Sequence, residues 1–287
     1  MSDSDFLRAS KIAVLGLGLM GGSLAMAVQP YCQAVYGYDP DPIASSEAWN
    51  SGIFYAVSDD PELWLNQVDY IVLAAPVNGI LSLIARLPGW HPGKVMVLDL
   101  GSTKEAIVGA MQSLPERFDP MGGHPMCGKE TSSFKNAEAK LFEGHPFILT
   151  PLDRTTRQMH QVTIELLERI GAQPLYLDAQ THDLWVSATS HVPHLIAHCL
   201  ASVTPTDSAP LIGPGFRSTA RLAATSSKIL LDILQTNRFN ILTQITAFEE
   251  QLHRIKVLLE GQEYEKLDKV LIQGANHYYE LIRRRDN

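Results

Sequence analysis

The feature that most constrains the fold is a glycine-rich turn, GLGLMG at residues 16–21, between a short apolar run and a helical stretch. KIAVLGL at 11–17 is typical of a buried parallel strand, and SLAMAVQ at 23–29 is typical of a helix. In G-x-G-x-x-G the first glycine allows a tight turn, the second lets a pyrophosphate approach, and the third lets helix and strand pack closely. Phosphate binds at helix N-termini, so we expect a dinucleotide here. The residues expected to contact it are Gly16, Leu17, Gly18, Leu19, Met20 and Gly21.

Asp39 supports the same interpretation. It ends a second predicted strand, AVYGYD at 34–39, and follows Gly18 by 21 residues. A carboxylate at this place can bind both ribose hydroxyls of NAD and would repel the additional phosphate of NADP. We therefore expect NAD as the cofactor. The alternative is a glycine-rich turn accompanied by a solvated aspartate.

Strand and helix signals alternate through the first part of the chain. The further predicted strands are 68–76, 94–102, 145–151 and 172–178, and the predicted helices are 42–51, 60–67, 77–87, 103–113 and 153–170. This alternation is typical of an α/β Rossmann-type doubly wound parallel sheet. We expect a dinucleotide-binding domain over residues 1–178.

After residue 178 the strand signals stop. Residues 179–203 predict one helix with a kink at Pro193. The rest of the pattern predicts an all-α helical domain over 179–287. Apolar residues recur there at steps of four and three, namely Ile241, Ile245, Phe248, Leu252, Ile255 and Leu259. Such seams pack helix against helix, either inside one chain or across a dimer.

Composition excludes several classes of partner. The chain carries 23 Lys and Arg against 31 Asp and Glu, a formal charge of −8, so we expect no nucleic-acid and no membrane partner. The apolar stretch at 14–28 is short for a bilayer span and holds four glycines. The cysteines have no paired spacing, which favours the reducing cytoplasm; they are Cys32, Cys127 and Cys199.

Chemically suggestive residues follow the predicted strands. Ala75 and Pro76 are small enough to let a cofactor pass, and Ser102 ends the run at 94–102. His124 stands in GGHPMCGKE at 122–130, which we expect to form a loop that approaches a ligand. A histidine can accept a hydroxyl proton near pH 7, and a serine can orient the same oxygen.

Simpler roles are open for both residues. Ser102 could be a helix N-cap with Glu105 as its capping-box partner. His124 could be a histidine that only fills a turn.

Polar residues in the helical half suggest a substrate cleft. Ser190, His194 and His198 share one helix face, although an interior face with satisfied hydrogen bonds is the alternative. The sequence between the histidines lacks the glutamate of H-E-x-x-H, so we expect no metal. Arg217 and Arg221 are four residues apart and could clamp a carboxylate, or they could be solvated surface charges.

Six segments, in this order, resemble the prephenate and arogenate dehydrogenases of tyrosine biosynthesis, the TyrA family. They are GLGLMGGSL at 16–24, DLGSTK at 99–104, GGHPMCGKE at 122–130, HPFILTP at 145–151, SHVPH at 190–194 and GFRSTAR at 215–221. The resemblance covers residues 11–285 and implies a Rossmann domain followed by a helical dimerisation domain. It also implies NAD-dependent oxidative decarboxylation of prephenate to 4-hydroxyphenylpyruvate in a homodimer.

The resemblance implies roles for individual residues. His124 matches the catalytic histidine that accepts the proton of the 4-hydroxyl, and Ser102 matches the serine that hydrogen-bonds this hydroxyl. Arg221 matches the arginine that holds a substrate carboxylate. Ser190 and His194 match positions that line the substrate pocket.

Two positions are less settled by the resemblance. Glu130 matches an acidic residue that is present in some members. Ser218 stands where many members have aspartate, which leaves the role of Arg217 open.

Other functions remain as alternatives. An arogenate-specific or dual cyclohexadienyl dehydrogenase would differ only in pocket residues. A β-hydroxyacid dehydrogenase would need a catalytic lysine on the helical domain, where this chain has histidines. An NAD-binding redox sensor would bind NAD without turnover, but it leaves Ser102, His124 and Arg221 unexplained.

Overall fold

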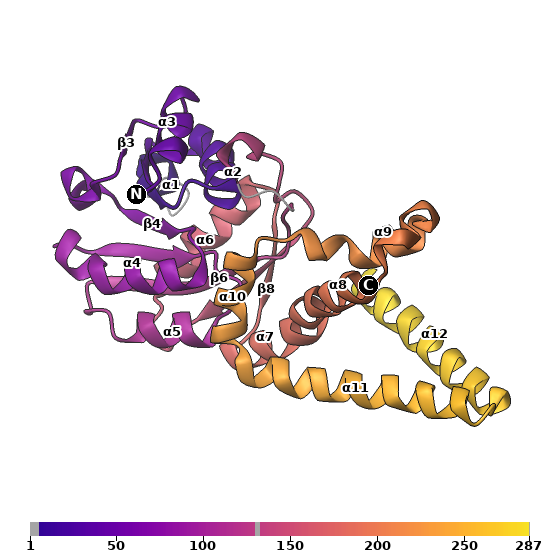
Figure 1. Ribbon diagram of the computed structural model, residues 1–287. Helices are drawn as coiled ribbons and strands as arrows, with labels where there is room; N and C mark the ends of the chain where they lie inside the picture. The colour runs from indigo at the N-terminus through magenta and orange to yellow at the C-terminus, as the bar shows by residue number, and fades with distance from the viewer. Residues whose placement is uncertain (1–5, 130–132, 287) are drawn as a thin grey trace. The chain divides into compact units, whose positions relative to one another are not determined.

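The computed structural model describes residues 6–129 and 133–286. In this part of the chain, eight strands form one sheet in the order β3-β2-β1-β4-β5-β6-β7-β8 (Figure 1). The strands are β1 (Lys11–Leu15), β2 (Ala34–Tyr38), β3 (Ala56–Ser58), β4 (Tyr70–Leu73), β5 (Val95–Asp99), β6 (Phe118–Pro125), β7 (Pro146–Pro151) and β8 (Gln173–Tyr176). The chain runs from β1 through β2 to β3 at one edge, and the next connection returns past β1 to β4, so the strand order reverses beside β1.

The doubly wound α/β sheet is confirmed, with one difference in strand direction. The strands from β3 to β6 are parallel, but β6 pairs with β7 antiparallel, and β8 is parallel to β7. Parallel neighbours need a long crossover, usually a helix. Between β6 and β7 the described residues form only a short 3-10 turn, Phe134–Asn136, so the chain returns in the opposite direction.

The expected loop around His124 is wrong, because GGHP forms the end of strand β6. Two glycines and two prolines make FDPMGGHP a poor strand sequence by itself. The strand forms because it is hydrogen-bonded on both sides, to β5 and to β7. The short strand β3 also gave no sequence signal, and the helix predicted at 60–67 is two 3-10 turns, Pro61–Leu63 and Leu65–Gln67.

Helices cover both faces of the sheet (Figure 1). Those of the first half are α1 (Phe6–Ala9), α2 (Leu19–Val28), α3 (Pro42–Asn50), α4 (Val77–Trp90), α5 (Glu105–Gln112) and α6 (Arg157–Arg169). Alternate residues of β1 point to opposite cores: Ile12 and Val14 pack with α2 and α6, whereas Ala13 and Leu15 pack with α4. Both faces are apolar because both are buried, which explains the continuous apolar runs in the sequence.

The second half is helical, as predicted. Its helices are α7 (Ala179–Val186), α8 (Val192–Val203), α9 (Pro214–Ala220), α10 (Ser227–Thr236), α11 (Arg238–Glu260) and α12 (Tyr264–Asp286). A π-helical turn, Ser187–His191, joins α7 to α8 where a kink at Pro193 was expected. Proline has no N–H to donate, so it is accommodated in the first turn of α8.

The chain forms two compact units, Met1–Arg238 and Phe239–Asn287. The predicted domain boundary at residue 178 lies inside the first unit, between β8 and α7, and stays a prediction. Among the described residues, no helix combines the length and the apolar character needed to cross a bilayer.

Candidate active site

The residues singled out in the first half of the sequence lie at one edge of the sheet. The glycine-rich turn follows β1, Asp39 follows β2, and Ala75 and Pro76 follow β4. Ser102 comes three residues after β5, and His124 lies near the end of β6. Because these five strands are parallel, their carboxyl ends lie at the same edge. Ligands of doubly wound folds bind at this edge, beside the strand where the order reverses.

The glycine-rich turn has the geometry that a dinucleotide requires. Gly16 has φ of +108°, and a Cβ there would lie 2.6 Å from the carbonyl oxygen of Ala74. A Cβ on Gly21 would lie 1.9 Å from the carbonyl oxygen of Gly16, so only glycine lets α2 pack this closely on the turn. In the described part of the chain, no side chain caps the N-terminus of α2 at Gly18. Its first N–H groups are therefore available to a phosphate.

Asp39 lies against this turn. Its Oδ2 accepts a hydrogen bond from the backbone N–H of Leu17 at 2.7 Å, and its Oδ1 accepts one from Asp41 at 2.9 Å. A carboxylate has about four lone-pair sites, so these two bonds leave capacity for ribose hydroxyls. The residues present at this edge thus fit an NAD-type dinucleotide.

The capping box proposed for Ser102 is wrong. Helix α5 begins at Glu105, its N-cap residue is Lys104, and no side chain of this segment caps it. Instead Asp183 of α7 accepts hydrogen bonds from the backbone N–H groups of Lys104 and Glu105, at 2.7 and 3.0 Å. Among the described residues, Ser102 has no side-chain hydrogen bond, so its hydroxyl is available to a ligand.

The residues on either side of Ser102 bind the segment that carries His124. Asp99 and Lys104 form a fully buried ion pair. Asp99 Oδ1 accepts from the N–H of Gly123 at 2.9 Å, while Lys104 Nζ donates to the Gly123 carbonyl at 2.6 Å. A Cβ on Gly123 would lie 2.5 Å from the Asp99 carbonyl oxygen, so this close approach requires glycine. The pair therefore fixes the backbone next to His124.

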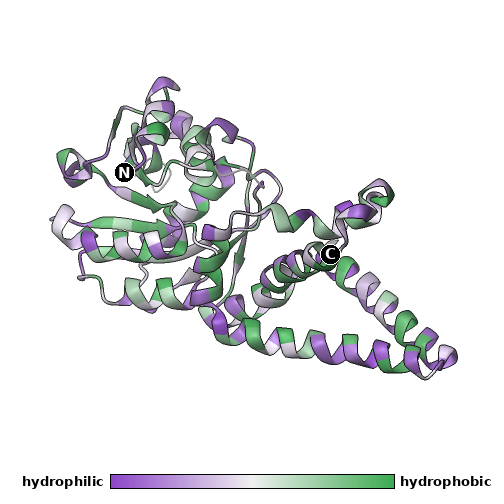
Figure 2. Ribbon diagram, viewed as in Figure 1, coloured by the Kyte–Doolittle hydropathy of each residue, from purple (hydrophilic) through white to green (hydrophobic). Residues whose placement is uncertain are grey.

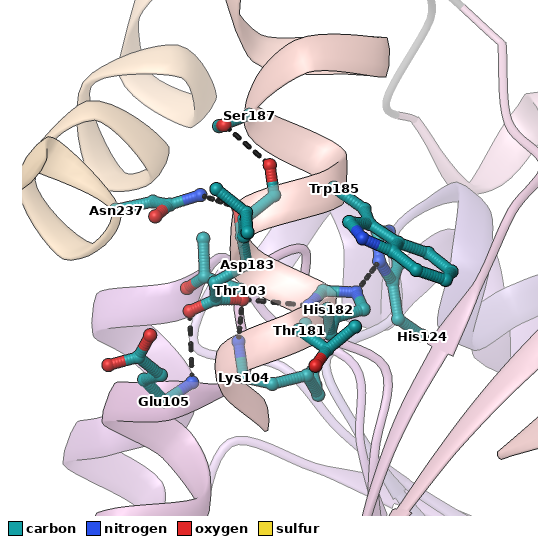
Figure 3. Close-up of polar contacts among 12 residues, drawn as sticks. Thr103, Lys104, Glu105, His124, Thr181, His182, Asp183, Trp185, Ser187 and Asn237 are labelled. Carbon is teal, nitrogen blue, oxygen red and sulfur yellow. Dashed lines mark hydrogen bonds and ion pairs between the residues drawn. The ribbon is translucent and has the colours of Figure 1, made fainter. Parts of the chain in front are cut away.

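His124 is the first residue of a hydrogen-bonded chain that ends on a carboxylate (Figure 3). Its Nδ1 is 2.8 Å from Nε2 of His182, and Nδ1 of His182 is 2.7 Å from Oδ1 of Asp183. His182 and Asp183 are buried, with 0% and 1% of their surface exposed. Burial lowers the pKa of His124 well below 6.5, and the neighbouring His182 and Lys104 lower this pKa further. Neutral His124 is therefore the form present at pH 7.

Sequence reasoning missed His182 and Asp183. The available signal was an adjacent histidine and aspartate in THDLWV, within a predicted helix, and the structure buries both of them together with Val186. Asn237 extends the network, since its Nδ2 donates to the carbonyl of Asp183 at 2.7 Å and lies 3.2 Å from His191 Nδ1. Burial lowers the pKa of His191 to about 4, although Asp183 opposes this shift.

The candidate substrate residues of the helical half lie on α8 and the turns that pack against it. His194 Nδ1 donates to the carbonyl of Ser190 at 2.8 Å, so its Nε2 is the ring nitrogen left for a ligand. Arg217 lies on α9, and Arg221 begins the 3-10 turn Arg221–Ala224, which packs against α8. Both arginines are exposed.

Two remaining expectations concern Glu130 and metal. Glu130 lies outside the described residues. Within 6–129 and 133–286, no group of three or more histidine, cysteine, aspartate or glutamate side chains is arranged to hold a metal ion.

Comparisons with known proteins identify the family of this chain. One family model, "Prephenate dehydrogenase, nucleotide-binding domain", matches residues 24–176, and a second, "Prephenate dehydrogenase, dimerization domain", matches residues 178–273. A prephenate dehydrogenase of Bacillus subtilis is 30% identical over 89% of this chain and 72% of its own length. A cyclohexadienyl dehydrogenase of Zymomonas mobilis is 28% identical over 89% of this chain and 90% of its own length.

A solved structure extends the comparison to three dimensions. The crystal structure of prephenate dehydrogenase from A. aeolicus, in complex with hydroxyphenyl propionate and NAD+, has a TM-score of 0.87 and 26% identity, covering 96% of this chain and 99% of its own. Fold and site together define a nucleotide-binding oxidoreductase. The chain belongs to the prephenate dehydrogenase family.

Proposed function

We propose that this chain is an NAD-dependent prephenate dehydrogenase, which converts prephenate to 4-hydroxyphenylpyruvate and CO2. The observation that carries the proposal is the state of His124. This histidine lies at the ligand-binding edge of the sheet and is bound through Nδ1 to His182, which leaves Nε2 for a substrate. Its lowered pKa keeps it neutral, as a general base at pH 7 must be.

The residues proposed to hold NAD are those at the turn after β1 and its neighbours. The pyrophosphate would lie on the uncapped N-terminus of α2, and Asp39 would accept the ribose hydroxyls. Ala75 borders the same turn, since a Cβ on Gly16 would lie 2.9 Å from its backbone nitrogen, and Pro76 follows it at the start of α4. When bound, NAD accepts a hydride from the ring carbon that bears the substrate hydroxyl.

The proposed chemistry at the substrate uses three side chains of this chain. His124 Nε2 accepts the hydroxyl proton, and the Ser102 hydroxyl orients the same oxygen. Arg221 binds a substrate carboxylate through charge-assisted hydrogen bonds, with His194 and Ser190 lining the pocket. As the carbonyl forms, the ring carboxylate leaves as CO2 and the ring becomes aromatic, which makes the reaction effectively irreversible.

Arogenate is the second candidate substrate, and dual specificity is the third. The relatives include a cyclohexadienyl dehydrogenase, and an arogenate dehydrogenase of Synechocystis has a TM-score of 0.77 with 25% identity over 94% of this chain. The two substrates differ in a side chain that carries a keto or an amino group. We favour prephenate because the B. subtilis relative at 30% identity carries that name.

The decisive experiment is a turnover assay of the purified protein. Formation of reduced nicotinamide is followed with prephenate or arogenate, each with NAD or NADP. We expect the highest kcat/KM with prephenate and NAD. Faster turnover of arogenate would move the assignment to that substrate, and binding of NAD without turnover in any combination would favour the redox-sensor alternative.

We also propose that the helical part forms a homodimer. In the second unit, large apolar side chains of α11 and α12 are exposed on the single chain, and apolar positions recur along both helices in Figure 2. They include Phe248, Leu252, Leu259, Tyr264, Leu271, Tyr278 and Leu281. Exposed apolar surface of this kind marks protein interfaces. Sedimentation velocity should give a dimer, which Leu252→Glu should weaken; a concentration-independent monomer would refute the proposal.

A further inference from the structure

The contact between His124 and His182 determines where the protons of both imidazoles lie. Both oxygens of Asp183 accept backbone N–H groups, from Lys104 and Glu105, so this carboxylate presents an acceptor to its neighbours. His182 Nδ1 lies 2.7 Å from Asp183 Oδ1 and must therefore donate (Figure 3). In its neutral form His182 then has no second N–H, which leaves its Nε2 as an acceptor.

The position of the proton on His124 follows from its contact with His182. Its Nδ1 lies 2.8 Å from Nε2 of His182, so opposite a neutral His182 this Nδ1 carries the proton of the His124 ring. The lone pair of His124 is then on Nε2. A histidine with its proton on Nε2 could not act as a base toward a substrate on that side.

We propose that His182 and Asp183 are positioning residues that hold His124 in the Nδ1–H tautomer and take up the positive charge that proton abstraction creates. The second part rests on the proposed function, in which His124 abstracts a hydroxyl proton. Neither residue touches the substrate in this scheme, because both act through the imidazole of His124.

The proton transfers balance along this chain. His124 Nε2 gains the hydroxyl proton, and the proton on its Nδ1 passes to Nε2 of His182. His182 keeps its Nδ1 proton in the hydrogen bond to Asp183, so the positive charge moves from His124 to His182. One proton has entered and none has been lost, and it leaves to water by the reverse path before the next turnover.

The surroundings of His124 explain why such a transfer is useful. The imidazole of His124 is desolvated, and His182, Lys104 and His191 are close enough to lower its pKa. A positive charge on His124 would be poorly solvated and would lie near a lysine. On His182 the same charge lies beside Asp183, where opposite charges attract more strongly than in water.

The tautomer can be measured without any turnover. Long-range 1H–15N correlation spectra of the full-length protein at pH 7.5 report which ring nitrogen of each histidine is protonated, and His124→Asn identifies the His124 signals. We expect His124 as the Nδ1–H form in the wild-type protein. Finding the Nε2–H form would overturn the proposal. The expected tautomer without turnover of prephenate or arogenate would instead count against the proposed function alone.

Variants of His182 connect the tautomer to the rate. His182→Leu removes the acceptor, so the Nε2–H form of His124 should appear and kcat should fall roughly 10- to 100-fold with little change in KM. His182→Gln can accept from His124 with its oxygen and donate to Asp183 with its nitrogen, so it should restore the Nδ1–H form and recover at least part of the rate. An unchanged tautomer and kcat in His182→Leu would refute the assignment.

A buried histidine outside the site provides the matched control. His91 contacts the carbonyls of Val68 and Gly93 at 3.1 and 3.2 Å, on the α4–β5 connection. His91→Leu should lower thermal stability but leave the His124 tautomer and kcat unchanged. If His182→Leu does not fold, the wild-type spectrum and the His182→Gln variant still decide the question. Finding the Nε2–H form of His124 in His182→Gln would contradict the proposal.

Discussion

The Oδ1 atom of Asp183 lies 2.7 Å from the backbone nitrogen of Lys104, 79 residues earlier in the chain. With Oδ2 on the N–H of Glu105, this carboxylate caps α5 from another helix. The same carboxylate holds His182, which holds His124. One side chain therefore joins the helix after Ser102 to the proposed base.

Removing this carboxylate should destabilise the protein. Asp183→Ala leaves the N-terminus of α5 and the ring of His182 without their acceptor, and the N–H of Lys104 and the ring of His182 are buried. Loss of a helix cap and of a buried hydrogen-bond partner together predict a decrease of about 3 kcal/mol in the free energy of unfolding. Urea denaturation measures it. Asp178→Ala removes an exposed cap, on Thr181 of α7, and should have a clearly smaller effect; equal losses would contradict this account.

The buried pair Asp99–Lys104 should be essential to the fold around His124. Lys104→Met leaves the Asp99 carboxylate without its cationic partner inside the protein, which predicts a loss of about 3–5 kcal/mol in unfolding free energy. The control is Lys135→Met, since Lys135 is exposed and its ion pair with Glu47 should contribute almost nothing. Similar melting temperatures for both variants would show that burial of the pair is not decisive.

The pH dependence of the reaction should reflect the lowered pKa of His124. The active form is neutral, so kcat/KM should rise with pH as His124 loses its proton and then stay level. Burial, together with His182, Lys104 and His191, lowers this pKa, so the midpoint of the rise should lie below pH 6.5. Initial rates measured over roughly two pH units on either side of the ordinary histidine pKa test this expectation. A midpoint at or above 6.5, or the same profile in His124→Asn, would remove His124 as the titrating base.

Asp39→Asn should relax the preference for NAD. The change keeps an acceptor for the N–H of Leu17 but removes the charge that repels the additional phosphate of NADP. The ratio of kcat/KM for NADP to that for NAD should rise on the order of tenfold, equivalent to about 1.4 kcal/mol. Asp39→Ala loses the bond to Leu17 as well and should bind both cofactors more weakly. An unchanged ratio in Asp39→Asn would separate Asp39 from cofactor selection.

Arg221→Ala should act on substrate binding. Loss of a charge-assisted hydrogen bond to a carboxylate predicts a KM for prephenate that is roughly 10- to 100-fold higher, with a much smaller change in kcat. Arg221→Lys keeps the charge but not the bidentate geometry, so its KM for prephenate should lie between those of the wild type and Arg221→Ala. Arg217→Ala is the matched test of the other arginine. If only Arg217→Ala raises KM, the carboxylate contact belongs to Arg217.

Local sequence patterns were sufficient to predict much of the sheet. The turn at Gly16–Gly21 and the apolar runs of β1, β2, β4 and β5 each lie within a few consecutive residues, so periodicity and glycine spacing reveal them. Strand β6 escaped prediction because FDPMGGHP has low strand propensity, and only its pairing with β5 and β7 makes it a strand.

Some residues of the candidate site are also visible in the local sequence, whereas the contacts between them depend on the tertiary structure. The sequence by itself determined that Gly18, Asp39 and Ser102 follow apolar strands and that His124 is a candidate base, because the chemistry of each is visible where it stands. Only the tertiary structure decided that Asp183 caps α5, and that His182 contacts His124 across 58 residues. These bonds join elements that are remote in the chain, and no local periodicity encodes them. They form because packing α7 against α5 buries polar groups, and each buried donor needs an acceptor.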